Sequence, residues 1–347
     1  MDITIIGAGA IGGVLGAYLV KDGKPVTFCD IAEEHVNKMN AEGLTIEGPD
    51  QTFTVKCSAY TPNELIKRGK MLDTVFLCVK AQHTEEAIRS VLPILSENSK
   101  IISFQNGLCE HVISKIIGDE RTIGCFVNFS ADYLSPGRIL YGGVASIYLG
   151  ELDGTITKRL LDLQEILTCW GPVEVTNNIW GYLWGKLSYA GLLFATALVD
   201  ETMAEVVRKQ EFRPMLMELC TEILEVAAKE GIQPVGFDDW EPTYIYPRET
   251  RDELVLNAQL EKLAKRMASN KKAKSGIWRD LAVRKRKTEI DFQLVPIIEI
   301  GAKHQIQMPV TRLLISLIKD IESGAAQMDW KNLSKLKEKY ESGETVC

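Results

Sequence analysis

Histidines and closely spaced cysteines are scarce in this sequence of 347 residues. The four histidines, at positions 35, 83, 111 and 304, are far apart and lack the spacing of metal ligands. The eight cysteines are also scattered, without a Cys-x-x-Cys motif, a pattern typical of reduced thiols rather than of disulfides or a zinc site. We therefore expect no metal centre and a cytoplasmic protein.

Long hydrophobic runs and an excess of positive charge are missing as well. The longest apolar stretch, residues 187–199, is interrupted by polar residues and is shorter than the about 20 residues of a membrane-spanning helix. Met1-Asp2 leads directly into a predicted strand, which leaves no room for a signal peptide. A formal net charge of −7 gives no reason to expect nucleic acid as a partner. The sequence thus predicts a soluble protein that binds neither membranes nor nucleic acids.

The length and the patterning of the chain favour two domains. A chain of 347 residues exceeds what one hydrophobic core usually serves. Up to about residue 178, strand-like and helix-like segments alternate, which predicts a parallel sheet with crossover helices. Residues 122–152 contain short strands separated by turns, which predicts antiparallel strands added to the edge of that sheet.

The remainder of the chain has helical periodicity to its C-terminus. We therefore predict an α/β N-terminal domain over residues 1–178, with a mostly parallel, doubly wound sheet and added antiparallel strands. An all-α C-terminal domain is predicted over residues 179–347. Ligands of doubly wound domains bind at the carboxyl ends of the parallel strands.

A glycine-rich turn follows the first predicted strand. It reads Gly7-Ala8-Gly9-Ala10-Ile11-Gly12, and an amphipathic helix is predicted from Val14 to Val20. Gly7 permits a tight turn, Gly9 lets a pyrophosphate approach the backbone, and Gly12 lets helix and strand pack closely. The start of the helix presents free N–H groups and the positive end of its dipole to phosphates. The pattern predicts a dinucleotide-binding (Rossmann) domain; the alternative is a glycine-rich turn that binds no ligand.

Asp30 ends the second predicted strand, at the distance from the glycine turn that the dinucleotide motif requires. A carboxylate there accepts hydrogen bonds from the ribose hydroxyls of NAD and would repel the 2′-phosphate of NADP. Residues 31–34 include no lysine or arginine that could pair with a phosphate. We therefore expect a preference for NAD. Alternatively, Asp30 caps the helix predicted to begin near Ala32.

Lys186 is the one charged side chain between Ile179 and Val199, where aromatic and aliphatic residues surround it. An ammonium in apolar surroundings has a lowered pKa, which suits a proton donor or acceptor. A snorkelling lysine or a structural ion pair is the alternative. Glu289 is a second candidate, because it follows a basic cluster and opens an apolar helix, although an acid near a helix start is also favoured by the dipole alone.

The chain resembles the ketopantoate reductases (2-dehydropantoate 2-reductases), which belong to the 6-phosphogluconate dehydrogenase-like group of two-domain enzymes. The resemblance covers nearly the full length. It rests on the order and spacing of the glycine turn, Cys78-Val79-Lys80, Gln105-Asn106-Gly107-Leu108, Trp184-Gly185-Lys186-Leu187 and Thr288-Glu289-Ile290-Asp291.

The resemblance implies hydride transfer from a nicotinamide to the ketone of a small anionic 2-oxo acid. Lys186 would be the general acid, and Glu289 would orient the substrate and the lysine. Asn106 would bridge the nicotinamide ribose and the substrate, Lys80 would lie along the cofactor, and Ala131 would meet the nicotinamide amide. The family also allows NADP as the cofactor and either a monomer or a homodimer.

Three departures from the family pattern concern specificity. Asp30 replaces the basic residue that usually follows the second strand. Ala190 and Phe194 occupy the positions of two asparagines that hold the substrate, four and eight residues after Lys186 on the same helix face. Gly276 replaces a substrate-binding serine, although the adjacent Ser275 could substitute for it.

The sequence therefore predicts a ketopantoate reductase-like NAD-dependent dehydrogenase whose pocket is more apolar and whose 2-oxo or 2-hydroxy acid differs from ketopantoate. Two alternatives stay open. The chain is a true 2-dehydropantoate 2-reductase of pantothenate biosynthesis, in which Ser188, Tyr189 or Ser275 replaces the missing contacts, or it is a non-catalytic NAD-binding sensor.

Overall fold

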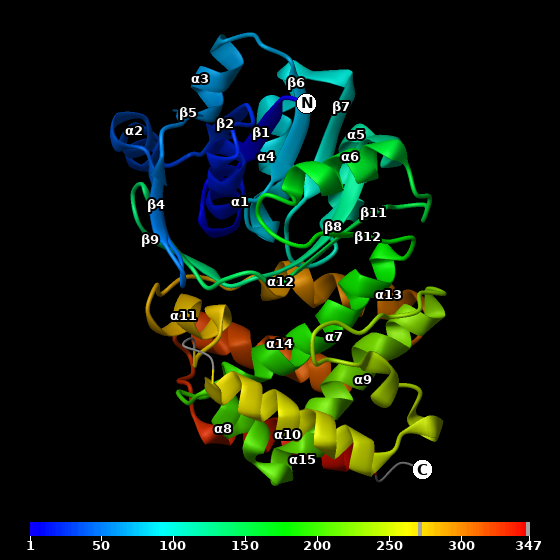
Figure 1. Ribbon diagram of the computed structural model, residues 1–347. Helices are drawn as coiled ribbons and strands as arrows, with labels where there is room; N and C mark the ends of the chain where they lie inside the picture. The colour runs from blue at the N-terminus through cyan, green and yellow to red at the C-terminus, as the bar shows by residue number, and fades with distance from the viewer. Residues whose placement is uncertain (270–272, 345–347) are drawn as a thin grey trace. The chain divides into compact units, whose positions relative to one another are not determined.

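The protein is described by a computed structural model that covers residues 1–269 and 273–344. The chain forms two compact units, Met1–Ile179 (unit 1) and Trp180–Cys347 (unit 2). In Figure 1, unit 1 carries the sheets and unit 2 is built from helices. The division lies one residue beyond the boundary that the sequence predicts.

The main sheet of unit 1 is mostly parallel. Its eight strands run in the order β12-β11-β8-β7-β6-β1-β2-β5, and the six strands from β8 to β5 are parallel to one another. The strands are β1 (Ile3–Ile6), β2 (Val26–Cys29), β5 (Ser58–Tyr60), β6 (Leu72–Leu77), β7 (Leu95–Ser103), β8 (Thr122–Asn128), β11 (Ser146–Glu151) and β12 (Glu174–Val175).

Helices cover both faces of this sheet (Figure 1). Residues of β1 alternate between two hydrophobic clusters: Ile5 packs in the cluster that contains Leu15, and Ile6 packs in the cluster that contains Ile88. Both faces of the sheet are therefore buried, as in other doubly wound sheets. The helices are α1 (Ala10–Lys21), α2 (Glu33–Glu42), α3 (Pro62–Lys67), α4 (Thr84–Val91), α5 (Glu110–Ile117) and α6 (Lys158–Leu167).

A second, four-stranded sheet corrects one prediction. Of the strands expected at the edge of the main sheet, β11 does join it, antiparallel to β8. The strands β9 (Ala131–Ser135) and β10 (Arg138–Tyr141) instead pair with β3 (Leu44–Glu47) and β4 (Thr52–Val55), in the order β4-β3-β10-β9. This sheet packs on α1 through a close approach, because a Cβ atom on Gly13 would lie 2.1 Å from Cδ1 of Ile139. One side of α1 thus packs on the main sheet, and the other side packs on the second sheet.

Unit 2 is helical, and its described residues contain no strand beyond an isolated bridge between Phe237 and Trp240. The central helix α9 has twelve buried residues and packs against α13, α14 and α15. The fold class predicted from the sequence, an α/β domain followed by a helical one, is confirmed. The helices are α7 (Ile179–Thr196), α8 (Met203–Arg208), α9 (Arg213–Lys229), α10 (Glu253–Ser269), α11 (Gly276–Ala282), α12 (Ile290–Gln293), α13 (Val295–Lys303), α14 (Pro309–Glu322) and α15 (Trp330–Glu344).

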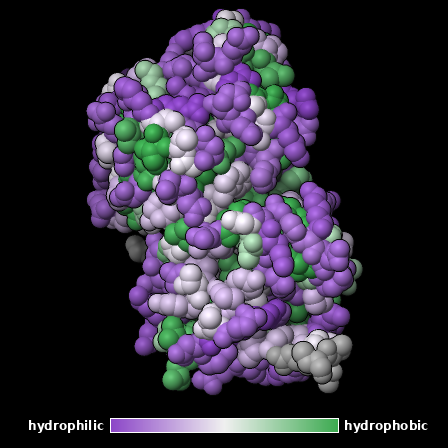
Figure 2. All heavy atoms as spheres, turned by 90° about the vertical axis from the view of Figure 1, so that its right-hand side faces the viewer, coloured by the Kyte–Doolittle hydropathy of each residue, from purple (hydrophilic) through white to green (hydrophobic). Residues whose placement is uncertain are grey.

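The surface shows small separate hydrophobic patches among hydrophilic residues on the face drawn in Figure 2. Within the described ranges, no helix is both long enough and apolar enough to cross a bilayer. None of the seven cysteines of those ranges forms a disulfide.

Candidate active site

Four predicted cofactor residues follow four neighbouring strands of the main sheet. Gly7 follows β1, Asp30 follows β2, Lys80 comes three residues after β6, and Asn106 comes three residues after β7. These strands are parallel and adjacent, in the order β7-β6-β1-β2, so their carboxyl ends lie along one edge. From β1 the chain runs outward through β2 to β5 on one side, and it then crosses back to β6 on the other side of β1. The edge beside β1 and β6 is therefore the topological switch point where ligands bind. Ala131 belongs to the second sheet, where it begins β9.

The glycine turn has the backbone geometry that its sequence predicts. Gly7 has φ +92°, and its N–H donates to the carbonyl of Cys29 at 2.8 Å. A Cβ atom on Gly12 would lie 2.2 Å from the carbonyl oxygen of Gly7 and 2.9 Å from the Cβ of Cys78. A Cβ atom on Gly9, by contrast, would meet no atom within 4 Å.

Gly9 is also the N-cap residue of α1, so the open space lies at the start of that helix. The first backbone N–H groups of a helix carry the positive end of its dipole. They lack hydrogen-bond acceptors within the helix, because no preceding turn provides carbonyl groups. The turn therefore fits a pyrophosphate: Gly12 closes the helix against the sheet, and Gly9 leaves the approach open.

Asp30 is hydrogen-bonded to the glycine turn. Its Oδ2 accepts the N–H of Ala8 at 2.9 Å, and its Oδ1 accepts the N–H of Ala32 at 3.0 Å. The N-cap residue of α2 is Ala32, so the interpretation of Asp30 as the helix cap is wrong. The carboxylate can accept about four hydrogen bonds, so two acceptor positions remain for other donors. Its neighbour Ile31 is 79% exposed and carries no charge.

Helix α7 places Lys186, Ala190 and Phe194 at successive turns of one face. Lys186 and Ala190 are partly exposed, whereas the side chain of Phe194 is fully buried. Next to the lysine, a Cβ atom on Gly185 would lie 2.3 Å from the carbonyl of Val235, so this position has no room for a side chain. The segment before Trp240 is thus packed tightly along the helix that presents Lys186.

Ser188 is engaged in hydrogen bonds within unit 2. Its buried hydroxyl donates to the carbonyl of Gly185 at 2.7 Å and accepts the indole N–H of Trp240 at 3.0 Å. The ring of Tyr189 lies 5.1 Å from the ring of Trp240, and burial raises the pKa of its hydroxyl to about 12. Both residues pack this helix against the loop that carries Trp240.

The remaining candidates lie at the beginnings of two short helices. Ser275 is the N-cap residue of α11, and its hydroxyl accepts the N–H of Trp278 at 3.1 Å. Gly276 is exposed, and a Cβ atom there would meet no atom within 4 Å. Glu289 is partly buried and is the N-cap residue of α12.

The segment that carries Glu289 is fixed by a residue that the sequence analysis missed. The backbone N–H and the hydroxyl of Thr288 donate to Oε1 of Glu322 at 2.7 and 2.6 Å. The same hydroxyl accepts the N–H of Ile290 at 3.2 Å. No local pattern could reveal this tether, because Glu322 is 34 positions away from Thr288.

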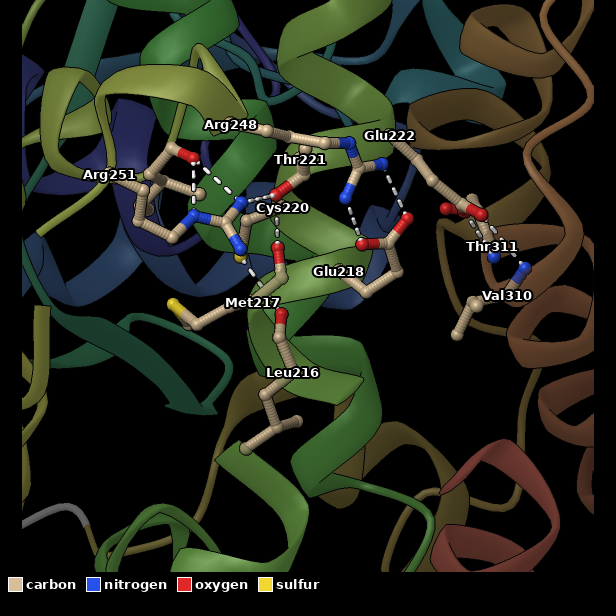
Figure 3. Close-up of polar contacts among 11 residues, drawn as sticks. Leu216, Met217, Glu218, Cys220, Thr221, Glu222, Arg248, Arg251, Val310 and Thr311 are labelled. Atoms are coloured by element: carbon tan, nitrogen blue, oxygen red, sulfur yellow. Dashed lines mark hydrogen bonds and ion pairs between the residues drawn. The ribbon is translucent and has the colours of Figure 1, made fainter. Parts of the chain in front are cut away.

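A polar cavity of ≈ 340 Å³ in unit 2 lies between α9 and the start of α14 (Figure 3). The carboxylate of Glu222 accepts the N–H groups of Val310 and Thr311 at 3.0 and 2.7 Å, and Arg248 pairs with Glu218. Burial raises the pKa of Glu222 to about 7. None of the residues predicted for catalysis or for binding lines this cavity, and Glu222 serves to cap α14.

Comparison with known proteins places this geometry in a family. Residues 3–154 match the family described as ketopantoate reductase PanE/ApbA, and residues 178–322 match its C-terminal domain. The chain belongs to the ketopantoate reductase family. The predicted family membership is confirmed, and the chain is an NAD(P)-dependent oxidoreductase of this family.

Two relatives match over nearly the full chain. The 2-dehydropantoate 2-reductase of Archaeoglobus fulgidus is 25% identical over 326 residues, which cover 93% of this chain and 98% of that protein. The 2-dehydropantoate 2-reductase of Pyrococcus horikoshii is 27% identical over 327 residues, with the same coverage of 93% and 98%.

Solved structures share the fold. A ketopantoate reductase of Ralstonia eutropha JMP134 superposes with a TM-score of 0.77 at 24% identity, covering 93% of this chain and 99% of that one. A D-mandelate dehydrogenase in a ternary structure with NADH and anilino(oxo)acetate superposes with a TM-score of 0.79 at 22% identity and the same coverage.

Proposed function

We propose that the chain transfers a hydride between NAD(H) and a small 2-oxo or 2-hydroxy acid. The observation that carries this proposal is the pairing of the open glycine turn with Asp30. The Asp30 carboxylate is held 2.9 Å from the N–H of Ala8, at the end of the strand beside β1. At this position the carboxylate would accept hydrogen bonds from the hydroxyls of an adenosine ribose and would repel a 2′-phosphate. Both effects favour NAD over NADP.

Unit 1 would hold the dinucleotide. The N–H groups of Gly9, Ala10 and Ile11 at the start of α1 would bind the pyrophosphate, with Gly7, Ala8 and Gly12 shaping the turn. Lys80, Asn106 and Ala131 would contact the nicotinamide half. The cofactor, when bound, supplies or accepts the hydride.

Lys186 of unit 2 would act as the general acid and base. In the reductive direction its ammonium donates a proton to the carbonyl oxygen of the substrate while the hydride reaches the carbon. Its positive charge also stabilises the oxygen as negative charge develops. Glu289, held in place beside Thr288, would orient the lysine and the substrate.

Ala190 and Phe194 set the expected substrate class. Neither residue can hydrogen-bond a substrate hydroxyl, and Phe194 is fully buried. A pocket without these donors selects against a hydroxylated acid and accepts a more apolar one. A polar contact with the substrate would have to come from Ser275 or from a serine introduced at Gly276.

A second candidate function is 2-dehydropantoate reduction in pantothenate biosynthesis, with NADH or NADPH. The similarity to relatives that are 2-dehydropantoate 2-reductases supports this candidate. The internal hydrogen bonds of Ser188 count against it, because they engage a hydroxyl that could otherwise contact the substrate. In either case we propose that residues 1–178 bind the cofactor and that residues 179–347 bind the substrate and could form a homodimer interface.

The test is oxidation of NADH and of NADPH by the purified protein with ketopantoate and with phenylglyoxylate, an apolar 2-oxo acid. The proposal expects NADH to be the better cofactor and phenylglyoxylate the better substrate. Faster turnover of ketopantoate would favour the second candidate. Saturable NADH binding without turnover of any 2-oxo acid would contradict both and support a sensor.

A further inference from the structure

Ala8, in the middle of the glycine turn, is held at both ends of its backbone. Its N–H donates to Oδ2 of Asp30 at 2.9 Å, and its carbonyl oxygen lies 2.9 Å from Nε2 of His35. Both partners come from the end of β2 and the start of α2. No spacing pattern in the sequence connects His35 to the glycine turn.

The second ring nitrogen of His35 defines its tautomer. Nδ1 accepts the N–H of Gly137 at 2.9 Å, so the ring proton resides on Nε2, which donates to the carbonyl of Ala8. The ring is 1% exposed and contacts the ring of Tyr133 edge-on at 5.1 Å. Gly137 in turn accepts the N–H of Thr45 at 2.8 Å through its carbonyl. His35 therefore connects the glycine turn to the second sheet.

The bond to Ala8 also determines where the next N–H points. The carbonyl of Ala8 and the N–H of Gly9 belong to one planar trans peptide, in which the two groups point in opposite directions. Since the carbonyl points at His35, the N–H of Gly9 points away from it. Gly9 is the turn residue with open space beside it.

We propose that His35 is a positioning residue for the cofactor: by holding the carbonyl of Ala8, it aims the N–H of Gly9 at the pyrophosphate. This inference rests on the proposed binding of NAD at the glycine turn. It explains why both ring nitrogens are bonded to backbone atoms, one on the turn and the other on the neighbouring sheet.

Two substitutions separate the two bonds. In His35→Gln the amide N–H₂ can occupy the place of Nε2 and keep the bond to Ala8, while the bond to Gly137 is lost. In His35→Asn the amide oxygen can occupy the place of Nδ1 and keep the bond to Gly137, while the bond to Ala8 is lost. Asn40→Ala is the matched control, because Asn40 ties the same helix to Ala59 with bonds of 2.8 and 2.9 Å and does not touch the turn.

The readouts are the Kd for NADH, from nicotinamide fluorescence, and the melting temperature. All three variants should have lower melting temperatures than the wild type. His35→Asn should raise the Kd about tenfold, and the other two should stay within about twofold, as expected for the loss of one directing hydrogen bond. An unchanged Kd in His35→Asn, or an equal rise in all three variants, would overturn the inference.

A measurement on the wild type covers the case in which His35→Asn does not fold. Isotope-labelled histidine should show His35 as the Nε2–H tautomer, and its signal should shift when NADH is added. An Nδ1–H tautomer, or a signal unmoved by saturating NADH, would overturn the inference alone. Wild-type protein that binds neither NADH nor NADPH would overturn the proposed function and the inference with it.

Discussion

The two units differ in the atoms that form their candidate sites. In unit 1 the glycine turn proposed for the pyrophosphate is made of backbone: a Cβ atom at Gly12 would lie 2.2 Å from the carbonyl oxygen of Gly7, so a side chain there would disturb the packing of helix on sheet. In unit 2 the site is made of side chains on the regular helix α7, where Ala190 is partly exposed and substitution leaves the helix intact. Side chains on α7 can therefore be replaced with less effect on packing than residues of the glycine turn.

The largest expected effect concerns the side-chain site. Lys186→Ala should lower kcat by at least about 10²-fold, because it removes both the proton donor and the positive charge. The Kd for NADH should stay near the wild-type value, since the residues proposed to bind the cofactor lie in unit 1. Lys186→Arg is the control: it keeps the charge but does not release a proton, so kcat should also fall while substrate binding persists. Full activity of either variant would exclude Lys186 as the acid.

A pair of glycine substitutions tests the backbone site. Gly12→Ala should lower the free energy of unfolding by about 3 kcal/mol, because its methyl group overlaps Gly7 and Ile5. Gly9→Ala should cost less than about 1 kcal/mol, since its methyl group meets open space, yet it should weaken NADH binding. Denaturant unfolding and NADH titration of both variants provide the comparison. Unchanged NADH affinity in Gly9→Ala would mean that the pyrophosphate does not bind at this turn.

Because Glu222 caps α14, we expect the stability of unit 2 to depend on pH. Burial raises the pKa of Glu222 to about 7 from 4.5, so between these values the folded protein binds more protons than the unfolded chain. The contribution of Glu222 to stability should therefore be greatest below about pH 4.5 and fall by about 3 kcal/mol as pH rises to about 7. The measurement is the difference in unfolding free energy between the wild type and Glu222→Gln across this range. A difference that is constant with pH would contradict the assigned burial effect.

The smallest effect concerns substrate choice. Ala190→Asn combined with Gly276→Ser should raise kcat/KM for ketopantoate by about three- to tenfold, because each adds a hydrogen-bonding group, at a partly exposed position and at an exposed one. Phe194 is left unchanged, since an amide in its fully buried place would lack partners. Gly276→Ser alone serves as the control for folding, because its Cβ has open space. No gain for ketopantoate would contradict the account of the altered pocket.

The parts of the fold and site that could be predicted are local in sequence. The glycine turn and Asp30 lie within 24 residues, and the period of the apolar residues distinguishes the α/β half from the helical half. The second sheet could not be predicted in this way, because β10 pairs with β3, about 90 positions earlier. The bonds of His35 to Gly137 and of Glu322 to Thr288 are long-range for the same reason. The catalytic roles of Lys186 and Glu289 stay predictions, because they depend on chemistry that a sequence pattern only indicates.

The measurement that tests the central claim most directly is titration of the wild type and of Asp30→Asn with NADH and NADPH. The wild type should bind NADH more tightly than NADPH. Asp30→Asn keeps an oxygen for the N–H of Ala8 but removes the charge, so the preference should narrow by about tenfold. Tighter binding of NADPH by the wild type, or a preference unchanged in Asp30→Asn, would contradict the assignment of the cofactor to this carboxylate.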